Sequence, residues 1–332
     1  MTLLLILLGV ALLFDFLNGF HDSANVVATI IASRAMSPRG ALVLAAAANL
    51  AGPFVLGVAV AQTIGEGIAE PHAVSIAVVL AALLAASLWD LATWYLGLPV
   101  SSSHALVGGI VGAVAAGSGT AEIQAHGLWK IGIALLVSPL LGFGVALLVM
   151  QATRWLLRAA TPRANVALSR AQIVTAAALA LSHGANDAQK TMGVISLGLV
   201  TLGFIPAFFV PWWVVVASAS AIALGTASGG WRIIRTLGAR FYRVGPIHAF
   251  TSQVASAAVI LGASFAGGPV SSTQVVSMAI LGAGAAERKS KVRWAVLGEL
   301  AAAWALTVPA TALLAAPLYY LTDAALRQGG WR

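Results

Sequence analysis

The sequence predicts an all-α integral membrane protein, and two features of its composition lead to that fold class. Of its 332 residues, 60% are hydrophobic and only 8% are charged. A soluble domain carries about 25% charged residues, so this chain has too few to cover a surface in water. The composition therefore excludes a soluble enzyme and a nucleic-acid-binding protein. The absence of cysteine excludes disulfides, thiol chemistry and cysteine-ligated metals.

Eight apolar units follow one another along the chain, and a simple span needs about 20 apolar residues. The units are 1–33, 41–62, 73–117, 128–152, 171–204, 212–234, 245–286 and 294–321. Polar and glycine residues interrupt the first and fifth units around 18–22 and 182–187, which predicts broken helices there. Gly and Pro interrupt the third and seventh at 97–100 and 267–270. These two units are too long for one span, so we expect re-entrant helical hairpins.

The second half of the chain repeats the first in order and in kind. Gly19 and Asp22 mark the first break, and Gly184 and Asp187 mark the fifth unit at the matching place. The hairpin breaks read Pro-Val-Ser-Ser-Ser at 99–103 and Pro-Val-Ser-Ser-Thr at 269–273. We interpret this as an internal duplication. The predicted organisation is a first repeat over 1–152, a basic linker over 153–170 and a second repeat over 171–332.

Basic residues give the predicted orientation, because cytoplasmic loops of membrane proteins are enriched in Lys and Arg. They cluster at 34–39, 154–170, 232–243 and 288–293, whereas loops 66–72, 117–126 and 203–211 are neutral or acidic. This pattern places both termini outside the plasma membrane and makes one repeat the upside-down copy of the other. Inverted repeats of broken helices are typical of secondary transporters, with the substrate site near the bilayer midplane.

The two hairpin tips are candidates for anion binding. A helix that begins inside the membrane directs unpaired N–H groups and a positive dipole end into the site, and hydroxyl groups add donors. Two facing tips would suit a tetrahedral oxyanion, although small residues can also serve only close helix packing. The hydroxyl residues are Ser101, Ser102, Ser103, Ser271, Ser272 and Thr273.

Asp22 and Asp187 lie inside apolar units, where a charged side chain is a functional candidate. Near an anion, a carboxylate is useful only with a cation or a proton, so both are candidates for ion coupling. The alternative is that each caps a half-helix. Lys190 shares a helix face with Asp187 and could pair with it or bind the anion.

Further polar side chains flank the breaks. Asn25, Asn186 and Gln189 offer neutral contacts to an ion or to neighbouring backbone, and His21, His104 and His183 are either ligands or packed polar groups. No hydrolase, zinc-protease or P-loop motif occurs. The chain is therefore predicted to be neither an enzyme nor, on its own, an ATP-driven pump.

The segments at 19–25 (Gly-Phe-His-Asp-Ser-Ala-Asn) and 183–187 (His-Gly-Ala-Asn-Asp) resemble the two signature segments of the inorganic phosphate transporter (PiT) family. The two hairpin motifs resemble the paired tips of that family, and the likeness covers nearly the whole chain. It implies cation-coupled phosphate uptake, a transport core built on the inverted repeat, and a homodimer. By this resemblance Asp22 and Asp187 correspond to cation-linked aspartates, and Asn25 and the tip hydroxyls to phosphate and cation contacts.

The chain departs from the family pattern at His21, where the pattern has Asn, and at 187–190. The Asp-Ala-Gln-Lys sequence there resembles proton-coupled bacterial or archaeal-type members. A fixed charge on Lys190 stands where a neutral ligand would help to hold Na⁺. We therefore favour a proton over Na⁺ as the coupling ion, with Na⁺ at Asp22 and Asp187 as the alternative. No cofactor and no other metal is expected.

The sequence thus predicts a symporter that takes up inorganic phosphate by alternating access around a midplane site. A metal–phosphate complex is kept as an alternative form of the substrate. A sulfate symporter of the same fold is the competing transporter, and an anion channel is the competing class. Phosphate can still donate a hydrogen bond near neutral pH whereas sulfate cannot, so an ionised aspartate beside the anion favours phosphate. A channel would have no need of paired buried aspartates.

Overall fold

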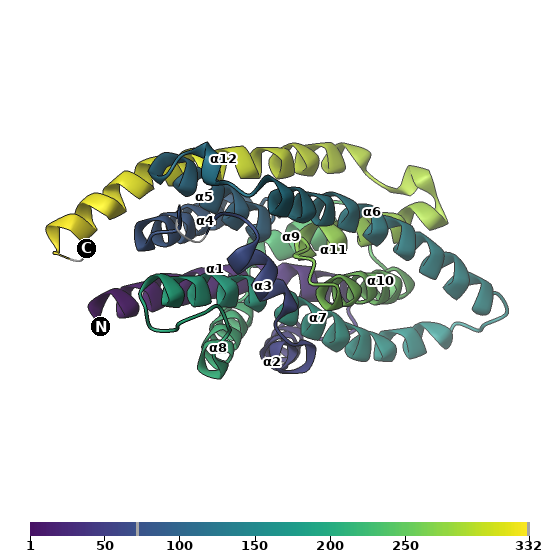
Figure 1. The fold of residues 1–332 in the computed structure, drawn as a ribbon. Coiled ribbons are helices and arrows are strands. Elements are labelled where there is room, and N and C mark those ends of the chain that lie inside the picture. Colours follow the sequence, from purple (N-terminus) through teal and green to yellow (C-terminus); the bar gives the residue numbers. More distant parts are fainter. Residues whose placement is uncertain (71–72, 331–332) are drawn as a thin grey trace.

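Twelve α-helices make up the part of the chain that the structure, a computed structural model, describes: residues 1–70 and 73–330 (Figure 1). The predicted loop residues 71 and 72 lie outside it. The helices are α1 (Thr2–Ala32), α2 (Pro38–Leu56), α3 (Ala59–Glu66), α4 (Ile76–Leu96), α5 (Ser102–Gly117), α6 (Ala125–Leu156), α7 (Ala164–Thr201), α8 (Trp212–Ser228), α9 (Trp231–Ala239), α10 (Pro246–Phe265), α11 (Ser272–Glu287) and α12 (Trp294–Gln328). The all-α prediction is confirmed.

Six of these helices, α1, α4, α6, α7, α10 and α12, are long and apolar enough to cross a membrane. Two bent pairs bring the number to eight if each pair is one span: α2 with α3, at 79°, and α8 with α9, at 70°. Large apolar side chains such as Leu136 and Leu140 on α6 and Leu313 on α12 are exposed on the outside of the bundle. Such a surface suits lipid, and the chain is a multi-pass membrane protein.

The breaks expected at 18–22 and 182–187 were wrongly placed, because α1 and α7 run through both segments without interruption. Gly19 and Gly184 serve helix packing instead. A Cβ atom on Gly19 would lie 2.1 Å from the carbonyl oxygen of Ile222 on α8, and one on Gly184 would lie 2.4 Å from that of Asn49 on α2. Small residues let membrane helices approach this closely. The broken helices are the bent pairs α2–α3 and α8–α9.

The two predicted hairpins are present, with α4 joined to α5 through 97–101 and α10 joined to α11 through 266–271. Gly97 and Gly267 adopt positive φ angles of 69° and 68°, a backbone conformation that glycine adopts without strain. Ser101 and Ser271 then cap the next helix, since each hydroxyl oxygen accepts a hydrogen bond from the backbone N–H three residues later.

Equivalent helices of the two halves make equivalent contacts. α1 packs against α8 as α7 packs against α2, and α5 packs against α12 as α11 packs against α6. Figure 1 shows α12 lying along α5. The two halves therefore interleave, because each hairpin rests on the last helix of the other half.

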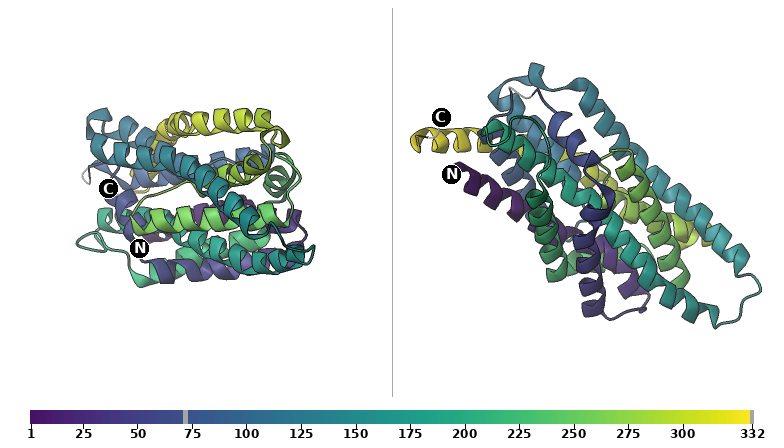
Figure 2. Two further views of the ribbon diagram at one scale, coloured as in Figure 1. Left: turned by 90° about the vertical axis from the view of Figure 1, so that its right-hand side faces the viewer. Right: turned by 60° about the horizontal axis from the view of Figure 1, so that its bottom comes forward.

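The start of α1 and the end of α12 lie near the same end of the bundle (Figure 1 and the right-hand view of Figure 2). The connection between α6 and α7 lies at the opposite end. α6 ends at Leu156 and α7 begins at Ala164, so both helices extend into the basic segment 153–170. This relative arrangement agrees with the expected one, and which end faces the cytoplasm stays a prediction.

Candidate functional site

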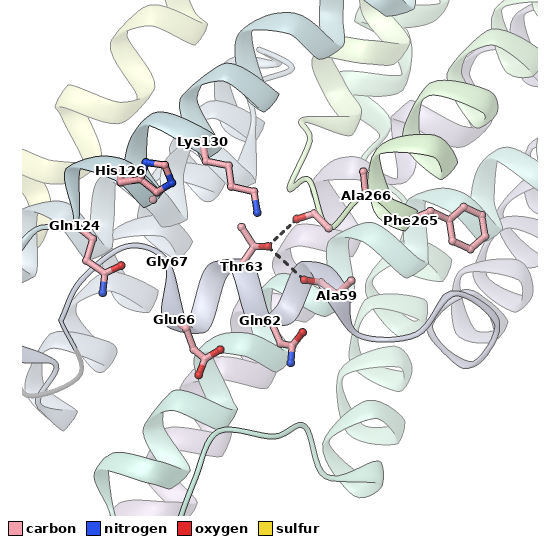
Figure 3. A pocket seen from close by; sticks show the side chains of 12 residues that line it. Ala59, Gln62, Thr63, Glu66, Gly67, Gln124, His126, Lys130, Phe265 and Ala266 are labelled. Carbon is pink, nitrogen blue, oxygen red and sulfur yellow. Dashed lines mark hydrogen bonds between the residues drawn. The ribbon is translucent and has the colours of Figure 1, made fainter.

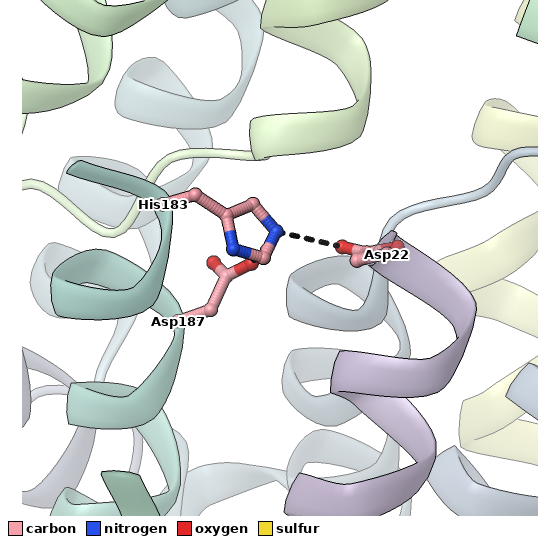
Figure 4. A group of neighbouring side chains, drawn as sticks. All are labelled: Asp22, His183 and Asp187. Carbon is pink, nitrogen blue, oxygen red and sulfur yellow. Dashed lines mark ion pairs between the residues drawn. The ribbon is translucent and has the colours of Figure 1, made fainter. Parts of the chain in front are cut away.

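The two intramembrane aspartates meet at the centre of the bundle. Asp22 comes from α1 and Asp187 from α7, and the imidazole of His183 lies between them (Figure 4). Its Nε2 atom is 3.0 Å from Oδ2 of Asp187 and 3.9 Å from Oδ2 of Asp22. All three residues are at most 1% exposed. The equivalent helices of the two halves thus bring their acids to one buried place.

The tip of the second hairpin lies against both acids. The Ser272 hydroxyl donates to Oδ2 of Asp187 at 2.8 Å and lies 3.4 Å from Oδ2 of Asp22. The Thr273 hydroxyl lies 3.2 Å from each carboxylate oxygen of Asp22. The side-chain amide of Asn25 donates a hydrogen bond to the Thr273 hydroxyl oxygen at 2.9 Å. The first turn of α11 is therefore fixed on the acid pair by side-chain hydrogen bonds.

Lys190 joins the first hairpin to the same centre. Its buried ammonium forms an ion pair with Asp187 and donates to the Ser103 hydroxyl at 2.5 Å and to the Val270 carbonyl at 2.9 Å. Ser103 also donates to Val270, at 3.1 Å. One cation thus contacts an acid from α7 and the tips of both hairpins.

The contacts of Asn25 and Lys190 correspond between the two halves of the chain. Asn25 and Lys190 each lie three residues after an aspartate, and each donates to the third hydroxyl of the opposite half's hairpin tip, Thr273 and Ser103 respectively. The two hydrogen bonds correspond, but at this position only the second half supplies a cation, Lys190, where the first half has the neutral Asn25. The hydrogen bonds to the hairpin tips are therefore alike in the two halves, whereas the positive charge at this position comes from the second half.

The other predicted tip residues are all buried. Ser101 and Ser271 are the helix caps described above, and Ser102 lies at the first position of α5. His21 is also buried, and its Nδ1 is 2.7 Å from Oδ1 of Asp22. His104, in the first turn of α5, is buried as well.

Asn186 and Gln189 face away from the aspartates. Asn186 donates to the Ser264 hydroxyl at 2.8 Å on α10, and the oxygen of Gln189 accepts from the backbone N–H of Val60 at 2.9 Å. Both side chains therefore fasten neighbouring helices to α7. On a continuous helix, these two positions do not share the face of Asp187.

His183 is the site residue that sequence reasoning did not select among the coupling residues. The available signal was its spacing, because residues four apart share a helix face and His183 lies four before Asp187. Together with Asp22 it completes a group whose ligand atoms lie within 4.8 Å of one another, close enough to hold a metal ion. Lys190 already neutralises one carboxylate of this group, so an added cation would meet a like charge.

A polar cavity of about 520 Å³ lies between α3, the start of α6 and the α10–α11 connection (Figure 3). Gln62, Thr63, Glu66, His126 and Lys130 are among the residues that line it, and Lys130 extends over Thr63. It ends at the connection of the second hairpin, just before the segment that contacts the acid pair.

Two matching hydrogen bonds join the short bent helices to the hairpin connections. On α3, the Thr63 hydroxyl donates to the carbonyl of Gly267 at 2.8 Å, and on α9, the Thr236 hydroxyl donates to that of Gly97, also at 2.8 Å. Each bond links one half of the chain to the hairpin of the other half. We call this pair the threonine latches.

The fold and the buried centre define a membrane transport protein. The chain belongs to the phosphate transporter family, whose model matches residues 18–315. It is 44% identical over 323 residues to a probable low-affinity inorganic phosphate transporter of Rhizobium meliloti, covering 97% of both chains. It is 40% identical to a protein of the same description in Bacillus subtilis, again covering 97% of both.

A solved structure, titled the sodium-dependent phosphate transporter, has the same fold. Its TM-score is 0.88 and its sequence identity is 24%, over 98% of this chain and all of the other. The predicted fold class and the expected family are thereby confirmed.

Proposed function

We propose that this protein is a symporter that takes up inorganic phosphate together with protons, by alternating access around the acid pair. The observation that carries the proposal is that both hairpin tips meet at one centre: Ser272 and Thr273 contact Asp22 and Asp187, and Ser103 contacts Lys190. Its relatives from Rhizobium meliloti and Bacillus subtilis are described as probable low-affinity inorganic phosphate transporters, which supports the choice of substrate.

The anion-binding part of the proposal rests on the helix N-termini. α5 and α11 begin at the centre of the bundle, and their N–H groups and positive dipole ends favour an anion. The hydroxyls of Ser272 and Thr273 and the ammonium of Lys190 are further donors within the same group. A singly or doubly protonated phosphate can donate to a carboxylate of Asp22 or Asp187. Fully ionised sulfate lacks that donor, so the acids favour phosphate over sulfate.

The choice of a proton over Na⁺ rests on Lys190. Its ammonium is already paired with Asp187, at a position where a Na⁺ ion would need a free carboxylate. Two unit charges 4 Å apart repel by about 4 kcal/mol at an effective dielectric constant near 20. A proton that binds a carboxylate instead gives a neutral carboxyl group and places no second cation beside Lys190.

Alternating access is supported by the threonine latches and the inverted repeat that we infer from the sequence. Each latch joins a short helix of one half to the opposite hairpin, so releasing one would free one side of the site while the other stays closed. The polar cavity over α3 ends at the Gly267 latch and is the approach from the outer side in the predicted orientation.

Uptake by purified protein in liposomes tests the proposal. An inward proton gradient should drive phosphate accumulation, an uncoupler should abolish it, and an inward Na⁺ gradient at constant pH should have no effect. Excess sulfate should compete poorly. Asp22→Asn and Asp187→Asn should abolish accumulation while phosphate exchange persists, because the hairpin donors remain. Lys289→Gln, an exposed lysine outside the cavity, is the control for protein handling.

Three results would overturn this assignment. Accumulation that requires a Na⁺ gradient at constant pH would replace the proton as coupling ion. Wild-type accumulation by both aspartate variants would remove the acids from coupling. Flux of phosphate only down its own gradient would favour a channel.

The proposal also includes a homodimer, which the family resemblance implies, and a plasma-membrane location. A metal–phosphate complex is kept as an alternative form of the substrate. Crosslinking of the purified protein in lipid tests the dimer. Uptake in the presence of a chelator of divalent cations tests the form of the substrate.

A further inference from the structure

A third buried carboxyl group, that of Asp15, lies on α1 outside the acid pair. Asp15 is fully buried, and neither of its oxygens has a hydrogen-bond partner of good geometry within the described residues. No ion pair to it occurs in that part of the chain either. The second half has Ala180 at the corresponding position, so the duplication does not account for this acid.

Two hydroxyl groups face Asp15, those of Thr191 on α7 and Ser218 on α8. Both residues are fully buried, and both oxygens also lack a partner of good geometry in the described structure. Asn18, one turn along α1, adds another unpaired buried oxygen. Three helices thus enclose a small group of oxygen atoms with no positive charge among them.

The charged groups around Asp15 would not stabilise a carboxylate. Asp187 on α7 is the charged neighbour that acts on it, and it has the same sign. α8 carries no charged or titratable side chain. On α4, Asp90 faces His21 and not Asp15, and on α1 itself Asp22 and His21 lie about two turns away.

This environment gives Asp15 a different preferred protonation state from that of the acid pair. An ionised carboxylate inside a membrane protein without a neighbouring cation costs several kcal/mol. Asp22 and Asp187 have His21, His183 and Lys190 as partners, so they can remain charged. Asp15 has none of these, and adding one proton removes its charge and creates an O–H donor for a facing hydroxyl.

Helix geometry places this group directly in line with the transport site. Asp15 and Asp22 are seven residues apart on one face of α1, which is a rise of about 10 Å. On α7, Thr191 follows Asp187 by four residues and shares its face. The Asp15 group therefore lies beside the acid pair toward the N-terminus of α1, the predicted outer end.

We propose that Asp15 is the residue that carries the coupling proton, binding it from the outer side before phosphate moves inward. This inference rests on the proposed proton symport and names a proton site outside the acid pair. The step is a simple proton binding: one H⁺ joins the carboxylate of Asp15 to give the acid, and the same H⁺ leaves toward the inside. Thr191 and Ser218 position the carboxyl group, because one hydroxyl can accept its O–H hydrogen bond while the other donates to its carbonyl oxygen.

Infrared spectroscopy of the purified protein at neutral pH tests the protonation without reference to transport. Wild type should show the C=O stretch of a buried protonated carboxyl group, which Asp15→Asn removes. Asp90 is another buried carboxyl without a hydrogen-bond partner in the described structure, so Asp90→Asn is the matched control: the band that Asp15→Asn removes should persist in it. Thr191→Val and Ser218→Ala should shift the band to higher frequency. A spectrum that Asp15→Asn leaves unchanged overturns the proposal. If Asp15→Asn does not fold, a spectrum that Thr191→Val and Ser218→Ala both leave unchanged overturns it.

Proton counting in liposomes then tests the coupling role. With a pH-sensitive dye, Asp15→Asn should move one proton fewer per phosphate than wild type and lose proton-driven accumulation, while phosphate exchange persists. If wild type moves protons with phosphate and Asp15→Asn moves the same number of protons per phosphate, the role of Asp15 is overturned and the proposed symport stands. A wild type that moves no protons with phosphate would overturn the proposed symport and this role with it.

Discussion

Replacing Lys190 by Asn gives the sharpest test of the charge distribution at the site. Asn is what the first half carries at the corresponding position, Asn25, so the change makes the two halves alike. It removes the cation paired with Asp187 and the donor to Val270. Breaking a buried ion pair by deleting one partner costs about 3–5 kcal/mol.

The lower end of that range applies here, because Asp187 keeps the Ser272 hydroxyl and the His183 imidazole. A loss of about 3 kcal/mol should lower the apparent Tm of the purified protein by about 5 °C or more, at the few degrees per kcal/mol typical of large domains. The vacated carboxylate of Asp187 should then bind Na⁺. An ion at a hundred times its Kd would restore about 2.7 kcal/mol.

Thermal unfolding in detergent, with either NaCl or choline chloride, measures both effects. Lys190→Asn should be destabilised in choline and largely rescued by Na⁺, whereas wild type should be insensitive to the choice of cation. Lys130→Asn is the matched control, since Lys130 is exposed at the cavity. A variant as stable as wild type in choline would refute the ion pair, and a destabilised variant that Na⁺ does not rescue would refute the latent cation site.

Three further predictions concern packing, substrate binding and topology. Gly19→Ala should destabilise the fold by about 1–3 kcal/mol, because its Cβ would lie 2.1 Å from a carbonyl oxygen of α8; Gly9→Ala, with nothing within 4 Å, should be neutral in the same melting assay. Ser102→Ala and Ser272→Ala should each weaken phosphate binding about 10- to 150-fold, since a hydrogen bond to a charged group contributes about 1.5–3 kcal/mol; normal binding by both, measured calorimetrically, would reduce these hydroxyls to packing. A single cysteine introduced into the 157–163 connection should react only with reagent from the cytoplasmic side, and labelling from outside would reverse the predicted orientation.

The fold class, the hairpins and the acid pair followed from the sequence because each depends on a repeated local pattern. The two Pro-Val-Ser-Ser motifs fixed the hairpin tips, and Asp22 and Asp187 stood out as charges in apolar units. The continuity of α1 could not be predicted in this way. A glycine such as Gly19 favours either a break or a close helix contact, and only the position of α8 decides between them.

Side-chain direction was the other limit of the sequence. Asn186 and Gln189 adjoin Asp187 in the chain but point to α10 and α3, while His183, four residues away, points to the acids. Once α7 is known to be a continuous helix, its 3.6-residue period accounts for all three directions. The isolation of Asp15 could not be predicted from the sequence either, because it depends on α7 and α8 placing no cation beside its carboxyl group.

The interleaving of the two halves has a consequence for how the chain matures at the ribosome. α5 begins at Ser102, yet the helix that covers it, α12, begins only at Trp294. Domains generally fold in order of synthesis, but here the first hairpin must wait, with a polar tip and an unpaired helix face, until almost the whole chain has been translated. Its correct burial is therefore a late event of biogenesis, and premature termination anywhere before α12 leaves the first half without the surface that completes it.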